Sequence, residues 1–200
     1  QLVLTLAALI LLTSFIMLAQ VRLDSLINTF AMQGLLLFFT TVLMAVISRE
    51  YHLLISAALT LFLKVFFIPI RLRRLVVVLD VRREVEVLGN PFLIMLFGTA
   101  LVLFSYYVAL PIRALSLLAT RNTIAISLAV VLIGMLIVIS RRKAITQVVG
   151  FMSMENGLFF AALVSTNGMP MVVELGIAFD VLVAAILFGV FFFHIRTEIG

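Results

Sequence analysis

The chain has 200 residues, of which 65% are hydrophobic and 12% are charged, and its mean hydropathy is +1.35. A soluble domain carries roughly twice that charged fraction, because it needs polar surface to cover its core. The composition therefore excludes both a soluble globular domain and a disordered chain. The apolar runs are long and continuous instead of alternating, which predicts an all-α, polytopic helical membrane protein.

Charge and cysteine content exclude several classes of function. The chain has no cysteine and two histidines, so it offers no disulfide, no thiolate metal site and no ligands for an iron–sulfur cluster. The net charge of +5 comes from basic residues in short loops between apolar runs, which is typical of membrane topology signals and not of a nucleic-acid surface. No nucleotide-binding loop or nucleophile motif is present. We therefore expect no catalytic site and no cofactor in this chain.

A membrane-spanning helix needs about 20 mostly apolar residues. Seven segments meet this requirement, and Asn90-Pro91 opens the fourth of them as a helix start should. The predicted spans lie near 2–19, 26–48, 53–70, 91–111, 122–140, 146–166 and 171–195.

The segment 71–90, RLRRLVVVLDVRREVEVLGN, is too charged to cross a bilayer. We expect it to lie at the membrane interface as an amphipathic segment. An extension of the third span and a short pair of strands are the alternatives. Functionally the segment is either a docking surface for a peripheral subunit or an anchor in the lipid headgroups.

Seven spans place the two termini on opposite sides of the membrane. The side with the C-terminus carries ten lysines and arginines, and the other side carries three, so the positive-inside rule predicts a cytoplasmic C-terminus and an external N-terminus. An assignment as a receptor or retinal protein would rest on helix number alone. The last predicted span also lacks the lysine that a retinal Schiff base needs, so we do not favour this assignment. The ten are Arg22, Arg71, Arg73, Arg74, Arg82, Arg83, Arg141, Arg142, Lys143 and Arg196; the three are Arg49, Arg113 and Arg121.

Four ionisable residues fall inside the predicted spans: Lys64, Glu155, Glu174 and Asp180. Each costs roughly 2.5–3.5 kcal/mol on membrane-insertion scales, so each is a candidate functional residue. We take all four as candidates for a proton relay.

Glu155 and Asp180 are both expected near the middle of the membrane, on consecutive antiparallel spans. The neighbours of Glu155 one turn away are Phe151 and Phe159, and this apolar shell favours a carboxyl that can hold a proton. Asp180 lies in a stripe of small residues with Gly176 and Ala184, which allows another helix to approach closely. A proton relay and a structural hydrogen bond between helices are both consistent with these patterns.

Lys64 lies in the middle of a span, five residues before Pro69, which is expected to kink or end that helix. From this depth the lysine would pair with a carboxylate, either as a switch that responds to proton arrival or as a static ion pair. Glu174 lies nearer the outer end of the last span and about 120° around the helix from Asp180. Glu174 is therefore either a residue at the external mouth of the proton path or a residue that is simply exposed to solvent.

The C-terminal sequence carries a family resemblance. The stretches SRRKAITQVVGFMSMENG and GMPMVVELGIAFDVLVA resemble the K-type subunit of respiratory complex I. Glu155 and Asp180 fall where that family has its two mid-membrane glutamates. With KVFFIP in the third span, the whole chain is similar to component E of hydrogenase-4, a membrane subunit of group 4 nickel–iron hydrogenases of the formate-hydrogenlyase type. The resemblance divides the chain into 1–139, with four to five helices and the interfacial segment 71–90, and a K-subunit-like region over 140–200.

The resemblance implies a multi-pass subunit of the membrane arm in a bacterial or archaeal cell membrane. Its carboxylates would contribute to a proton or sodium relay, with Lys64 biasing their charge. Partners would be membrane lipids, antiporter-like and quinone-subunit-like membrane subunits, and a peripheral arm that holds the nickel–iron centre and the iron–sulfur clusters. The alternatives are a K-type subunit of a complex I variant, a small subunit of a cation/proton antiporter, and a purely structural membrane scaffold.

Overall fold

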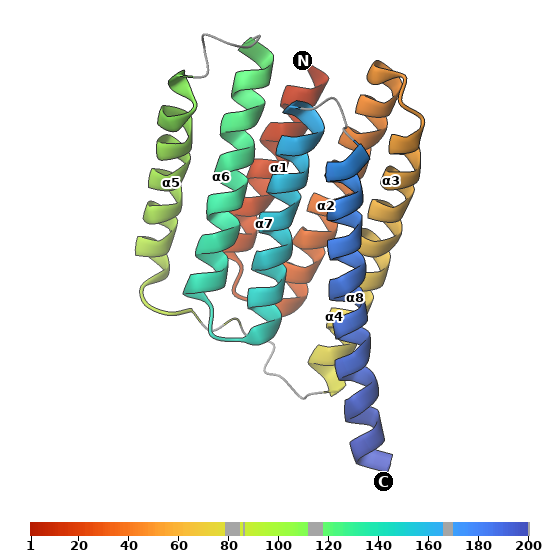
Figure 1. Cartoon of the computed structure of the whole chain (residues 1–200). Helices are drawn as coiled ribbons and strands as arrows, with labels where there is room; N and C mark the ends of the chain where they lie inside the picture. Colours follow the sequence, from red (N-terminus) through yellow and green to blue (C-terminus); the bar gives the residue numbers. More distant parts are fainter. Residues whose placement is uncertain (79–84, 86, 112–117, 166–169, 200) are drawn as a thin grey trace.

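A computed structural model describes residues 1–78, 85, 87–111, 118–165 and 170–199, without the side chains of 118–121, 170, 172–173 and 191–199. In this part of the chain, helices run up and down side by side and form one bundle (Figure 1). The helices are α1 (Leu2–Ala19), α2 (Leu23–Ser48), α3 (His52–Thr60), the π-helical turn η1 (Leu61–Phe67), α4 (Ile68–Val78), α5 (Pro91–Val108), α6 (Leu118–Ser140), α7 (Ala144–Ser165) and α8 (Pro170–Ile199).

The predicted fold class is confirmed. Six helices in the described part of the chain are long and apolar enough to cross a membrane, with α3, η1 and α4 counted together as one helix over His52–Val78. The 30-residue helix α8 corresponds to the seventh predicted span. The described residues form no strand, and the one bridge among them joins Val87 to Arg141.

The third helix is longer than the sequence predicted. The span was expected over 53–70, with Pro69 as a kink or end, but the helix continues through Pro69 to Val78. The π-helical turn over 61–67 lies directly before the proline. A proline lacks the amide for one helical hydrogen bond and crowds the preceding turn, and a wider π turn relieves that crowding. Pro69 therefore does not end the helix.

The first part of segment 71–90 is the extension of the third span that was weighed as an alternative. Residues 71–78 are helical, with Leu72 and Leu75 buried and Arg73 and Arg74 exposed. Residues 79–84 and 86, with Arg82 and Arg83, lie outside the described residues. Between them, the backbone amide of Val85 donates to the Val21 carbonyl at 2.7 Å. After them, the backbone amide of Leu88 donates to the Ser140 carbonyl at 2.8 Å.

The start of α5 is as predicted. Pro91 is at its first turn, and the Asn90 side chain accepts a hydrogen bond from the Phe92 amide at 2.9 Å. The helix ends at Val108, three residues before Pro111. It lies at the edge of the bundle against α6 and α1, and of its residues Gly98 and Ser105 are buried. Most of its apolar surface therefore faces outward, as lipid or a partner would require.

The two termini lie at opposite ends of the bundle, as an odd number of spans requires (Figure 1). The α1–α2 and α6–α7 connections lie at the C-terminal end, where the sequence places the arginine-rich loops. The α2–α3 connection lies at the other end. Arg113 lies outside the described residues, and the side chains of Arg121 and Arg196 are not described, so the orientation in the membrane stays a prediction.

Helices α6 and α7 are in very close contact because three glycines line their crossing. A Cβ atom at position 134 would lie 2.6 Å from the backbone nitrogen of Met154. A Cβ at position 157 would lie 2.9 Å from the backbone nitrogen of Val131, and one at position 150 would lie 2.8 Å from Cγ2 of Ile137. Small residues at such a contact are the usual means of helix association in membranes. They fix α7, which carries Glu155, against the centre of the bundle.

We predict that Gly134→Ala lowers the free energy of unfolding by about 1–3 kcal/mol, because the new methyl group must displace backbone and not a flexible side chain. Gly189→Ala is the matched control, since nothing lies within 4 Å of a Cβ there. Thermal unfolding of the purified protein in detergent, followed by circular dichroism, measures the difference. Equal stability of the two variants would contradict this description of the α6–α7 contact.

Candidate functional site

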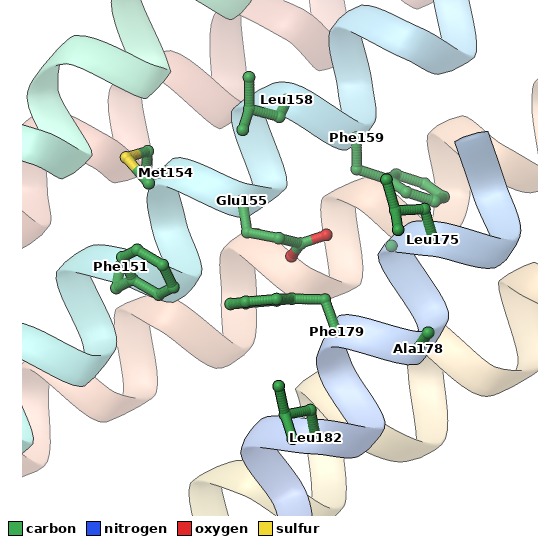
Figure 2. Close-up of a pocket in the computed structure, with 10 residues that line it drawn as sticks. Phe151, Met154, Glu155, Leu158, Phe159, Leu175, Ala178, Phe179 and Leu182 are labelled. Atoms are coloured by element: carbon green, nitrogen blue, oxygen red, sulfur yellow. The ribbon is translucent and has the colours of Figure 1, made fainter.

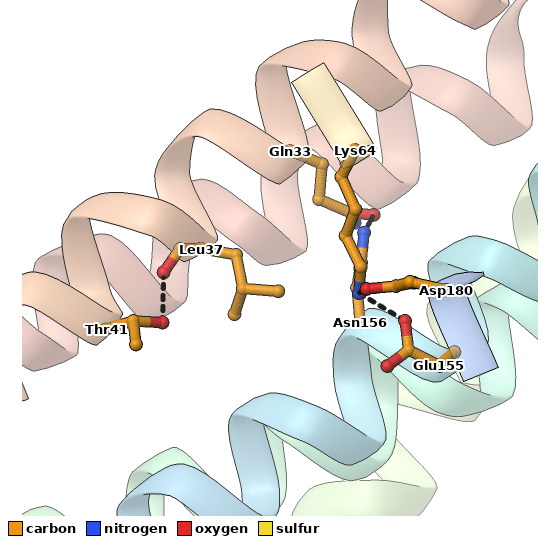
Figure 3. A network of polar contacts seen from close by, with 7 residues as sticks. All are labelled: Gln33, Leu37, Thr41, Lys64, Glu155, Asn156 and Asp180. Atoms are coloured by element: carbon orange, nitrogen blue, oxygen red, sulfur yellow. Dashed lines mark hydrogen bonds and ion pairs between the residues drawn. The ribbon is translucent and has the colours of Figure 1, made fainter. Parts of the chain in front are cut away.

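The side chain of Lys64 is buried and lies between two carboxylates. Its ammonium group donates a hydrogen bond to Oε2 of Glu155 and another to Oδ1 of Asn156, the latter at 2.6 Å. Oδ2 of Asp180 lies 3.4 Å from the same nitrogen, within ion-pair distance. Lys64 is 1% exposed, Asp180 is 2% exposed and Glu155 is 8% exposed. The residues come from η1, α7 and α8, and all of them point toward one centre (Figure 3).

Two glycines allow these helices to meet. A Cβ atom at position 34 in α2 would lie 3.1 Å from Cβ of Lys64, so any larger residue there would press on η1. A Cβ at position 176 in α8 would lie 2.8 Å from the Phe159 ring and 3.3 Å from Oε1 of Glu155. The small residue predicted beside Asp180 therefore permits the close approach of α8 to α7.

An aromatic ring also contacts the lysine. The Lys64 nitrogen lies 5.5 Å from the centre of the Phe159 ring, within cation–π range. Phe159 is 5% exposed and belongs to the buried cluster near the α2–α3 end of the bundle. The ring therefore shields one side of the ion pairs from lipid and water, which strengthens the electrostatic interactions inside.

The charges of the cluster do not cancel when every group is ionised. Lys64 contributes one positive charge, and Glu155 and Asp180 contribute two negative charges. A buried net charge is unfavourable, so one additional proton or monovalent cation brings the cluster to neutrality. Oδ1 of Asp180 is buried and has no hydrogen-bond partner in the described part of the chain, which leaves an acceptor for such an ion.

A line of polar side chains continues from the cluster across the bundle. Asn156 donates from Nδ2 to Oε1 of Gln33 at 2.9 Å, and Gln33 donates from Nε2 to the Ser14 hydroxyl at 2.8 Å. The Ser14 hydroxyl in turn donates to the Ile10 carbonyl at 3.1 Å. All four residues are completely buried. The network thus connects α8, η1, α7, α2 and α1 through hydrogen bonds and ion pairs. Figure 3 shows its part from Asp180 to Gln33.

Sequence analysis found the charged members of this network but missed Gln33 and Ser14. Gln33 offered a signal, because a glutamine in an otherwise apolar span is itself costly and needs a partner. Ser14 offered none, since serines occur at many helix contacts in membranes. Asn156 is adjacent to Glu155 in sequence, but its role as a bridge depends on the position of α2.

The structure does not bring the fourth candidate, Glu174, into the cluster. Its side chain is exposed near the start of α8, while Asp180 lies almost two turns further along that helix and is buried. The two carboxylates that pair with Lys64 are those of Glu155 and Asp180. Glu174 therefore serves as a natural comparison residue on the same helix.

An apolar groove between α7 and α8 reaches Glu155 from outside the bundle. It encloses about 480 Å³ and is lined by Phe151, Leu158, Phe179 and Leu182 among other apolar residues. Among the described residues of its lining, Glu155 is the charged one. Figure 2 shows the carboxylate between these side chains. The groove therefore connects Glu155 to the lateral face of the protein.

The chain's own residues do not fit a nickel–iron centre or an iron–sulfur cluster. Cysteine thiolates hold both kinds of centre, and the sequence has no cysteine. Within the described residues no three histidine, aspartate or glutamate side chains lie together as a metal site.

Sequence comparison confirms the resemblance to hydrogenase-4 component E. The chain is 25% identical to that protein of Escherichia coli K12 over 182 residues, which cover 91% of this chain and 84% of the relative; the Shigella flexneri protein of the same name matches equally. The chain is also 34% identical over 119 residues to the uncharacterized protein Rv0085 of Mycobacterium tuberculosis, which covers 60% of this chain and about half, 54%, of that relative. No family model matches, and no solved structure matches. The resemblance of 140–200 to the complex I subunit remains a prediction.

We predict that Lys64→Met destabilises the protein by about 3–5 kcal/mol, because it leaves two buried carboxylates without a cation. Combining it with Glu155→Gln should recover part of this loss, with a coupling energy of at least about 1 kcal/mol. Glu174→Gln should show no coupling to Lys64→Met. Thermal unfolding of the single and double variants gives both couplings, and equal values for Glu155 and Glu174 would contradict the assigned ion pair.

Proposed function

We propose that this chain is a membrane-arm subunit of an energy-converting nickel–iron hydrogenase complex in a bacterial or archaeal cell membrane. Similarity to hydrogenase-4 component E over 91% of the chain supports membership in such a complex. The chain would perform no hydrogen chemistry itself. Its task is to couple electron transfer in partner subunits to the movement of protons or sodium ions.

The observation that carries this proposal is the position of Lys64 between Glu155 and Asp180 inside the bundle. Buried ionisable groups in membrane proteins usually belong to ion pathways. A static pair needs one carboxylate for one lysine. The second carboxylate gives the cluster two ways to distribute its charges, which is what a relay requires.

The geometry suggests how the relay works. When a proton neutralises the Glu155 carboxyl, the ammonium group of Lys64 is free to pair more closely with Asp180, which is already 3.4 Å away. When the proton leaves, Lys64 returns to Glu155. Lys64 therefore moves between the two carboxylates by a change of rotamer. The carboxylate with which it pairs depends on whether Glu155 carries a proton. Glu174, which is exposed and lies outside the cluster, would stand at the external end of the path, where solvent can take over its role.

Partner subunits would complete the path. The groove between α7 and α8 offers an apolar seat for a transmembrane helix of an antiporter-like or quinone-subunit-like subunit, with Glu155 at its wall. Protons could then pass between Glu155 and a polar group of that helix. The nickel–iron centre and the iron–sulfur clusters would reside in a peripheral arm, where they supply the redox energy that drives the relay.

Two other functions remain as competitors. A purely structural scaffold is favoured by the hydrogen-bonded line from Asn156 through Gln33 to Ser14, which holds three helices together. A K-type subunit of a complex I variant, or of a cation/proton antiporter, would use the same carboxylates with a different redox partner. The two experiments below separate these possibilities.

The first experiment asks which complex contains the chain. We predict that an affinity tag on this chain in its native host isolates a multisubunit membrane complex that contains nickel and iron, measured by plasma mass spectrometry of the purified sample. The complex should reduce a viologen dye with hydrogen. An intact, active complex without nickel would contradict the hydrogenase assignment and favour the complex I or antiporter alternative.

The second experiment tests the relay. In membrane vesicles, Glu155→Gln should abolish hydrogen-dependent ion uptake while hydrogen oxidation with a viologen dye continues, because glutamine cannot release a proton. Glu174→Gln is the matched control on a neighbouring helix and should reduce uptake far less. Co-purification of the other subunits with each variant checks assembly.

Two results would contradict the relay. Full ion uptake in the Glu155→Gln complex shows that this carboxyl conducts nothing. Loss of assembly in Glu155→Gln, together with loss of assembly in the milder Glu155→Asp, supports the scaffold instead.

A further inference from the structure

Arg141 is a buried arginine whose guanidinium group is only partly paired. It lies in the short connection between α6 and α7 and is 1% exposed. Its Nη2 donates a hydrogen bond to the carbonyl of Leu18 at the end of α1. Its Nε and Nη1 are buried and have no hydrogen-bond partner in the structure described. Nε carries one N–H and Nη1 carries two, so three N–H donors on these two atoms remain unused.

The charge of Arg141 needs a counter-charge that the described part of the chain does not supply. Burial lowers the pKa of Arg141 below its usual value, but a guanidinium group keeps its proton in proteins. A buried charge without a partner is strongly unfavourable. The unused donors are arranged as a rigid fork that matches the oxygens of a carboxylate or phosphate.

A pocket of about 210 Å³ lies in front of this group. One wall is the end of α1 with Leu18 and Ala19, and another is the first turn of α5 with Pro91, Phe92 and Met95. The N-terminus of a helix attracts anions through its dipole, and α5 has 18 residues. The buried guanidinium group and the N-terminus of α5 therefore both favour a negatively charged ligand in the pocket. Among the described residues that line the pocket, Arg141 is the charged one.

The position of the pocket indicates the source of the anion. It lies at the arginine-rich end of the bundle, where the chain passes from membrane-spanning helices into loops. Phe92 and Leu96, on the first turns of α5, are exposed apolar residues that would face lipid tails. Basic pockets between membrane helices at this depth are suited to lipid headgroups. A free phosphate ion would leave the apolar walls without a contact.

We propose that Arg141 binds the phosphate group of a membrane phospholipid, whose glycerol backbone and upper acyl chain lie against the apolar wall formed by α1 and α5. The phosphate balances the positive charge of Arg141, and the lipid contacts α1, α5 and the α6–α7 connection and holds them together. The site is separate from the Lys64 cluster and does not depend on the proposed role in a hydrogenase.

The test compares retained lipid in the full chain, purified in mild detergent and examined by native mass spectrometry. We expect Arg141→Gln to retain phospholipid about tenfold less than the unmodified protein, since a charged hydrogen-bond partner is lost. Arg142→Gln is the matched control, because Arg142 is the adjacent residue and is exposed. Equal lipid retention by both variants would overturn the proposal.

A second pair of variants keeps the test decisive if Arg141→Gln does not fold. Ala19→Trp should fill the pocket while leaving Arg141 in place, and Ala19→Ser is its control. After removal of lipid, phosphatidylglycerol should raise the melting temperature of the unmodified protein and of Ala19→Ser, but not of Ala19→Trp. An equal rise in all three proteins would overturn the proposed location.

A test with inorganic phosphate distinguishes a phospholipid headgroup from a free phosphate ion as the bound anion. Added to the delipidated protein, it should stabilise less than phosphatidylglycerol because it makes no apolar contacts. If phosphate stabilises the protein and phosphatidylglycerol does not, the site binds a free anion and the lipid assignment is wrong.

Discussion

The ammonium group of Lys64 between the carboxylates of Glu155 and Asp180 is the interaction on which this fold depends most. Because ionised groups cannot remain isolated in an apolar bundle, the helices that carry them must meet at one point. Gly34 and Gly176 remove the side chains that would prevent that meeting. The π-helical turn over 61–67 lets the third helix continue past Pro69 with Lys64 directed into the bundle.

The same contacts hold the helices together and would also serve the proposed relay. Asn156, Gln33 and Ser14 carry the polar interactions from the cluster to α1, so the cluster also fixes the register of several helices. Networks in which every member has a partner are rigid. The second carboxylate and the unpaired Oδ1 of Asp180 depart from that rule. This departure is what the proposed ion pathway would require and what simple adhesion between helices would not.

Sequence alone predicted the all-α fold, the spans and the three charged members of the cluster, because a charge within an apolar run is conspicuous. It did not predict which helices pair, so Gln33 and Ser14 were missed and Glu174 was grouped with residues that it does not contact. The predicted third span ends at 70 because a proline usually kinks or ends a helix, whereas here a π turn accommodates Pro69. From the sequence, Arg141 is only a topology signal. Its burial follows from the position of α1 and α5, which no local pattern encodes.

Infrared difference spectroscopy of the purified complex tests the central claim most directly, because it detects a carboxyl group that gains or loses a proton during turnover. The account predicts that hydrogen addition produces a carbonyl-stretch signal of a protonated carboxyl. That signal should disappear in Glu155→Gln or shift in Asp180→Asn, and it should persist in Glu174→Gln. A difference spectrum that is the same in all four proteins would show that the cluster around Lys64 keeps its protons throughout, and that its role is structural.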